Sequence, residues 1–213
     1  LGVMFGYMLI ATEPLFGRFR FINDHPALPD GPIGTEGLGT AEPRLLADGR
    51  TVLVSTFLCG LYLLEGIETE SPSGRLVASF PQKKGENCAI PVVRGNHYIV
   101  TVPAYSGVVS LDISDPAKPR EVSRVVFDST DVPHWISMSP DGRRLVVTGY
   151  ESMKHRVELL HFDGATGALT RDTLFRDAGA ATPGVRLDNK TWPHGGTGAG
   201  VPHGAVFSRP KAP

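Results

Sequence analysis

Two histidines occupy matching places in two similar stretches of the sequence, and they are the residues best suited to chemistry. His134 and His203 each follow a Val-Pro pair and precede a short apolar segment that ends at Ser-Pro or Ser-Arg-Pro. Matching positions of a structural repeat lie at matching places in space. Neutral imidazole binds zinc, copper and iron, and it titrates near neutral pH. The pair therefore predicts a metal site or an acid/base site that both histidines share.

Other reactive side chains are expected at the same site. His194, in a Trp-Pro-His-Gly-Gly segment, and Cys88 are further candidate metal ligands, and a thiolate narrows the choice to zinc or copper. Candidate catalytic residues, which would shape the pocket or activate water, are Glu42, Tyr150 and Glu151. The competing interpretation is that His134 and His203 only begin strands, with ring nitrogens bonded to neighbouring backbone carbonyls.

The two cysteines of the chain leave three interpretations open. Cys59 and Cys88 could form a disulfide, act as metal ligands, or be two unrelated buried thiols. Two cysteines fix nothing by their spacing alone. Their distance decides, because a disulfide needs α-carbons within about 7 Å of each other.

Three consecutive strand-rich modules are predicted to position these side chains. Each module contains four short strands. Two of the modules have an Asp-Gly turn between their first two strands, at Asp48-Gly49 and at Asp141-Gly142. The modules span residues 42–80, 88–127 and 134–175. This length and strand content are typical of a β-propeller blade. The predicted fold is therefore all-β, a single propeller domain with four-stranded antiparallel blades over residues 1–213.

The two ends of the chain predict one more, divided blade. Residues 203–208 look like a first strand alone, and residues 1–23 supply two strands, at 3–10 and 18–22. A blade completed from both ends would close a four-bladed ring and remove exposed sheet edges. The other interpretation is a fragment of a seven-bladed ring, N-terminally truncated. In that case a missing segment or an oligomer partner would close the ring.

Blade geometry places the candidate residues at one mouth of the central channel. The innermost strand of each blade begins near that mouth, at Ala41 or Glu42, at Asn87 or Cys88, at His134 and at His203. The loop between strands two and three opens on the same face, and it carries Cys59, Tyr105, and Tyr150 with Glu151. One rim thus gathers imidazole, carboxylate, thiol and phenol groups.

Composition excludes several function classes. The net charge of −1 gives no basic surface for nucleic acid. The apolar run at residues 1–12 contains two glycines and is too short to span a bilayer. The sequence has no Gly-x-Ser-x-Gly, phosphate-loop, dinucleotide-binding or His-Glu-x-x-His motif, which argues against serine hydrolases, kinases and Rossmann oxidoreductases.

Several of these motifs resemble one set of propellers. The segment 135–148, Trp-Ile-Ser-Met-Ser-Pro-Asp-Gly-Arg-Arg-Leu-Val-Val-Thr, resembles the blade signature of lactonase-like (YVTN-type) and selenium-binding-protein-like seven-bladed propellers. The segment 109–119, Val-Ser-Leu-Asp-Ile-Ser-Asp-Pro-Ala-Lys-Pro, is similar to the LVIVD-type repeat of bacterial surface and periplasmic proteins. A Pro-His pair before such a strand is typical of the selenium-binding-protein family, which includes methanethiol oxidases with a copper site built from channel-facing histidines.

The resemblance implies a function but transfers only part of a site. By motif position it assigns His134 and His203 as metal ligands, while Glu42 and Asn87 or Cys88 stand where the family would have histidine. It implies a metal-dependent oxidoreductase with copper or zinc. The alternatives are a non-catalytic propeller that binds a small molecule or a protein at its rim, and a lactonase-like hydrolase. Both the bacterial periplasm and the cytoplasm remain open as compartments.

Overall fold

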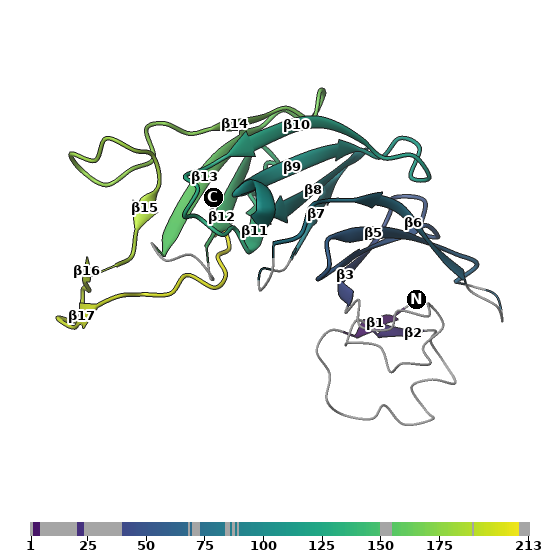
Figure 1. The fold of residues 1–213 in the computed structure, drawn as a ribbon, viewed down its shortest axis with the longest axis horizontal. Coiled ribbons are helices and arrows are strands. Elements are labelled where there is room, and N and C mark those ends of the chain that lie inside the picture. Colours follow the sequence, from purple (N-terminus) through teal and green to yellow (C-terminus); the bar gives the residue numbers. More distant parts are fainter. Residues whose placement is uncertain are drawn as a thin grey trace, which may run out of the picture.

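Three packed antiparallel sheets make up most of the structure. The computed structural model describes residues 2–4, 21–23, 40–67, 69, 73–83, 86, 88, 90–149, 155–188 and 190–208. Two of the sheets have four strands and the third has five, and in each the strands pair mainly in chain order (Figure 1). Consecutive sheets of this kind, packed face to face, are the blades of a propeller. The predicted all-β class with four-stranded antiparallel blades is confirmed.

The first two blades contain the strands expected from the sequence. Blade 1 runs β3 (Thr40–Leu45), β4 (Val52–Thr56), β5 (Gly60–Glu65) and β6 (Ser73–Ser79). Blade 2 runs β7 (Val92–Arg94), β8 (His97–Val102), β9 (Gly107–Asp112) and β10 (Arg120–Val126), with the single helical turn η1 (Pro103–Tyr105) between β8 and β9. Blade 2 lies between blades 1 and 3 in Figure 1.

Blade 3 differs from the prediction in its outer strand. It runs β11 (Trp135–Met138), β12 (Arg144–Thr148), β13 (Arg156–Phe162) and β14 (Leu169–Arg171). A strand was expected to continue to residue 175, but the Asp172 carboxylate accepts hydrogen bonds from the amides of Leu174 and Phe175 and turns the chain away. The short strand β15 (Val185–Arg186) then pairs with the free beginning of β13.

Glycine sets the turn between the first two strands of every blade. Gly49, Gly95 and Gly142 have φ angles of +70°, +56° and +72°, the left-handed region that other residues rarely adopt. In blade 1 the Asp48 carboxylate also accepts hydrogen bonds from the amides of Arg50 and Thr51. The sequence pattern that predicted these hairpins therefore has a direct conformational cause.

Both faces of blade 2 are buried, and they hold the three blades together. Along β8 the side chains alternate: Tyr98 and Val100 pack into the cluster shared with blade 1, while Ile99 packs into the cluster shared with blade 3. All three are at most 2% exposed. Burial of an aliphatic side chain such as Ile99 or Val100 contributes about 1.5–3 kcal/mol. These contacts fix how neighbouring blades sit relative to one another.

The predicted parts of the divided blade do not form one sheet in the described residues. β1 (Gly2–Met4) and β2 (Phe21–Asn23) pair with each other in parallel, and no other strand pairs with them in the described part of the chain. Residues 203–208 contain no strand. Closure of the ring from both ends remains a prediction. No helix among the described residues is long and apolar enough to cross a membrane.

Candidate site at the channel mouth

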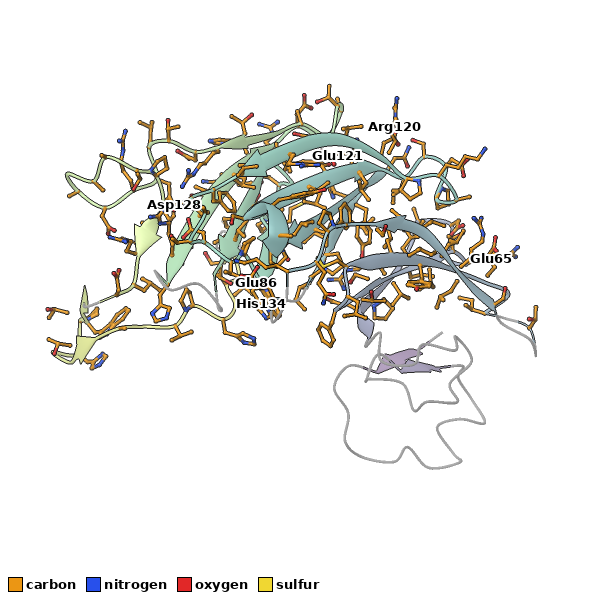
Figure 2. All side chains as sticks on the ribbon, in the orientation of Figure 1. Glu65, Glu86, Arg120, Glu121, Asp128 and His134 are labelled. Carbon is orange, nitrogen blue, oxygen red and sulfur yellow. A yellow bond between two sulfur atoms is a disulfide. The ribbon has the colours of Figure 1, made fainter. Side chains whose placement is uncertain are left out.

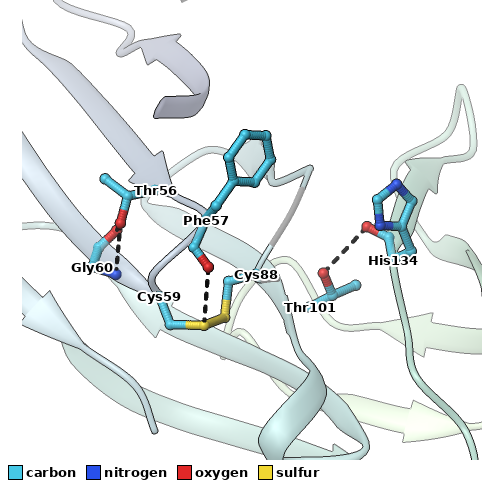
Figure 3. Close-up of a disulfide and its surroundings, with 7 residues drawn as sticks. All are labelled: Thr56, Phe57, Cys59, Gly60, Cys88, Thr101 and His134. Carbon is cyan, nitrogen blue, oxygen red and sulfur yellow. Dashed lines mark hydrogen bonds between the residues drawn. A yellow bond between two sulfur atoms is a disulfide. The ribbon is translucent and has the colours of Figure 1, made fainter. Parts of the chain in front are cut away.

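His134 is held at the start of the inner strand of blade 3 by contacts from two blades. Its amide donates to the Thr148 carbonyl at 2.8 Å, within its own blade. Its carbonyl accepts a hydrogen bond from the Thr101 hydroxyl of blade 2 at 3.3 Å (Figure 3). Pro133, which is buried, precedes it and restricts the backbone there. In Figure 2 His134 lies at the lower edge of the blades.

His203 lies directly against His134. The two ring centroids are 5.0 Å apart and the ring planes differ by 26°, so the imidazoles are stacked. The His203 carbonyl accepts a hydrogen bond from the Thr148 hydroxyl at 2.8 Å. Trp135 stands beside the pair, with its ring centroid 6.2 Å from that of His203. The two histidines that the repeat singled out are therefore neighbours, although they are 69 positions apart (203 − 134).

The environment keeps His134 neutral at physiological pH. Burial lowers the pKa of His134 to about 4, and the charge of His203 in its protonated form acts in the same direction. A neutral imidazole has a free lone pair on one ring nitrogen and is the form that binds metals. At neutral pH His134 is thus a neutral imidazole rather than a cation.

The distance between the two rings bears on whether they could share a metal ion. With ligand–metal bonds of about 2 Å, two imidazoles on one ion have ring centres roughly 4.5–5 Å apart. The observed 5.0 Å is close to that separation, but the stacked ring planes differ by only 26°, so one ring has to turn before the in-plane lone pairs of both can point at one ion. In the part of the chain that the structure describes, no group of three or more His, Cys, Asp or Glu side chains could hold a metal. Among the described residues, the two imidazoles are the candidate ligands that the structure brings together.

Cys88 does not join the histidines as a thiolate. Cys88 forms a disulfide with Cys59, with α-carbons 4.9 Å apart, and both residues are buried (Figure 3). A sulfur in a disulfide has no thiolate lone pair to offer a metal. The prediction of Cys88 as a metal ligand is therefore corrected, and of the three interpretations of the cysteines the structure selects the disulfide.

The structure describes two of the four other predicted site residues. Glu42 forms an ion pair with Arg44, two residues along the same strand. His194 is exposed at the tip of the small hairpin formed by β16 (Lys190–Thr191) and β17 (Thr197–Gly198), which projects beyond blade 3 in Figure 1. It forms no metal-binding group with the histidine pair among the described residues. Tyr150 and Glu151 lie outside the described residues.

A buried ionic cluster near His134 was missed by the sequence reasoning. Arg156 lies 3.2 Å from Asp131 and 3.6 Å from Glu158, and Arg171 donates to Glu158 at 2.6 Å. Burial raises the pKa of Glu158, while the hydrogen bond from Arg171 acts against that shift. The segment leading to His134 carries Asp131, so the cluster ties this segment to β13. Arg156 and Glu158 share one strand face with the buried Leu160, and this alternation is the signal that could have revealed them.

Two threonines at this mouth were also not anticipated. Thr101 and Thr148 occupy corresponding places near the ends of the second strands of blades 2 and 3. Both are at most 1% exposed. The two threonines were readable from the sequence, but the histidine carbonyls that their hydroxyls bind were not.

Comparisons with known proteins support the fold. No family model and no curated protein matches the chain. Among solved structures, a hypothetical selenium-binding protein of Sulfolobus tokodaii matches with a TM-score of 0.50 and 18% identity, over 62% of this chain and 40% of that one. A provisionally assigned 6-phosphogluconolactonase of Bacteroides uniformis matches with 0.53 and 12% identity, over 70% and 44%.

A third solved structure, the periplasmic gluconolactonase of Pseudomonas aeruginosa, matches with a TM-score of 0.50 and 18% identity, over 64% of this chain and 39% of that one. The chain thus spans about two fifths of the length of these proteins (40%, 44% and 39%). At such identities the likeness establishes the architecture and not the chemistry. The chain has the blade fold of a β-propeller, with neighbours among selenium-binding-like and gluconolactonase-like proteins.

Proposed function

We propose that the channel mouth binds one copper or zinc ion through His134 and His203, and that the copper form is an oxidoreductase of the selenium-binding-protein type. The observation that carries the proposal is the stacked pair of imidazoles from matching repeat positions, with ring centroids 5.0 Å apart. When bound, copper would supply one-electron redox chemistry and zinc would supply Lewis-acid chemistry.

The residues of this chain do the holding and orienting. His134 is neutral because its pKa is lowered to about 4, so an ion does not have to displace a proton from it near pH 7. The backbone of each histidine is fixed by hydrogen bonds from buried threonines. Ligands whose positions are fixed before binding lose less entropy when the metal arrives. Trp135 provides an aromatic wall beside the pair for an apolar substrate group.

Metal analysis of the purified protein tests the proposal. The parent chain, loaded with copper or zinc and then desalted, is compared with the double variant His134→Ala/His203→Ala. The matched control is His194→Ala, because that histidine is exposed on a separate hairpin. We expect one ion per chain in the parent and in the control, and none in the double variant. Equal metal content in all three proteins would overturn the proposal.

The identity of the metal separates the candidate functions. Selective retention of copper supports the oxidoreductase. Retention of zinc, together with hydrolysis of a lactone that stops in the double variant, supports a gluconolactonase-like hydrolase that uses a rim carboxylate such as Glu42 or Glu151. If the parent retains no metal, the function is instead that of a propeller that binds a small molecule or a protein at its rim.

A further inference from the structure

One residue is bonded to both histidines of the pair. The backbone carbonyl of Thr148 accepts the His134 amide at 2.8 Å, and the Thr148 hydroxyl donates to the His203 carbonyl at 2.8 Å. Thr148 ends β12 and is 1% exposed, so water does not compete for these bonds. Thr148 therefore holds both His134, at the start of blade 3, and His203, in the segment that follows this blade.

The same arrangement occurs one blade earlier. The Thr101 hydroxyl of blade 2 donates to the carbonyl of His134, the first residue of the next module (Figure 3). Thr101 is 0% exposed. A threonine hydroxyl near the end of a second strand thus binds the carbonyl of a histidine in both blades, Thr101 that of His134 and Thr148 that of His203. We call each of these two contacts a threonine clasp.

The junction between blades 1 and 2 is built differently. Ser55 stands at the corresponding place, and its hydroxyl donates to the Glu42 carbonyl in its own blade at 3.5 Å. The Cys59–Cys88 disulfide crosses this junction instead, and the Cys88 amide donates to the Phe57 carbonyl. Clasps therefore occur at the two junctions that carry histidines, and a covalent bond occurs at the junction that carries none.

We propose that Thr148 is the positioning residue that sets the spacing of the His134–His203 pair, with Thr101 holding His134 from the other side. The inference deepens the proposed metal site, and its functional part rests on that proposal. Residues 203–208 are in no strand, so the hydroxyl bond to the His203 carbonyl supplies a constraint that strand pairing does not. Partners that orient metal ligands from behind typically change metal affinity by about 10-fold to 100-fold when they are mutated.

Three substitutions test this inference. Thr148→Val removes the hydroxyl and keeps the backbone carbonyl that holds His134. Thr148→Ser keeps both groups. Thr56→Val is the matched control, because it removes an equally buried threonine hydroxyl whose bonds stay within blade 1. The measurements are the nuclear Overhauser effect between the two imidazole rings in metal-free protein, the dissociation constant for Cu²⁺ alone, and the melting temperature.

We expect Thr148→Val to lose the nuclear Overhauser effect between the two imidazole rings and to bind Cu²⁺ about 10-fold to 100-fold more weakly. Thr148→Ser should restore both, and Thr56→Val should lower the melting temperature while leaving both intact. If Thr148→Val keeps the ring contact and the affinity, the inference is wrong even though the metal site stands. If the parent shows the ring contact but binds no copper, the metal proposal fails. The loss or retention of the ring contact in Thr148→Val then decides whether Thr148 positions the pair. If Thr148→Val does not fold, Thr101→Val replaces it, with the same expected weakening and with retention of both properties as the contrary result.

Discussion

The disulfide between blades 1 and 2 gives the prediction whose size follows most directly from the structure. Replacing both cysteines, as Cys59→Ala/Cys88→Ala, removes a cross-link between residues 29 positions apart. The chain-entropy relation for a loop of this length gives a loss of roughly 3.6 kcal/mol of unfolding free energy at 25 °C. For a chain of this size each kcal/mol corresponds to about 2–4 °C, so the melting temperature should fall by roughly 7–14 °C.

Differential scanning calorimetry measures this change, and a reductant provides the control. A thiol reductant should lower the melting temperature of the parent and leave that of the double variant unchanged. Alkylation of the unfolded parent without reductant, followed by intact-mass measurement, should detect no free thiol. If the double variant has the same melting temperature as the parent, or if the parent is alkylated at both cysteines, the disulfide does not stabilise the fold as expected.

Three further predictions concern the neighbourhood of the histidines. The pKa of His134 lies below its unfolded value of about 6.5, so the unfolded state binds more protons between pH 6.5 and about pH 4. The unfolding free energy measured by urea titration should therefore be highest above pH 6.5 and fall as the pH drops toward 4, and His134→Gln should flatten this dependence. Arg156→Ala removes one of the two cations beside the buried Glu158 carboxylate and should lower the unfolding free energy by about 3–5 kcal/mol in the same titrations. An unchanged urea midpoint would show that the ionic cluster does not stabilise the fold. Gly184→Ala would drive a methyl group into the Glu158 carboxylate and should destabilise the fold by more than Gly179→Ala, which has a similar positive φ and open space around it; equal melting temperatures would contradict this packing.

The blades were predictable because their causes are local. An Asp-Gly pair requires a left-handed backbone at its glycine, as at Gly49 and Gly142, and this fixes the hairpins. Alternating apolar residues, as in β8, fix which face of a strand is buried. The contact between His134 and His203 was predictable only because the repeat made the two positions equivalent.

The remaining features depend on contacts that sequence patterns do not encode. Two cysteines specify no partner by themselves, so the disulfide could not be chosen in advance. The pairing of Arg156 with Asp131 joins residues from two segments, and the end of β14 is set by the turn that Asp172 makes. The prediction of Cys88 as a metal ligand was wrong for the same reason, because its disulfide partner, Cys59, lies in the preceding blade.

The most direct test of the central claim is to count the imidazoles on bound copper. Pulsed electron paramagnetic resonance of the Cu²⁺-loaded parent, prepared with ¹⁵N-labelled histidine, reports each coordinated imidazole nitrogen. We expect two such nitrogens in the parent, one in each of His134→Ala and His203→Ala, and no bound copper in the double variant. A copper spectrum that is unchanged in the double variant, or a parent that holds no copper, would contradict it.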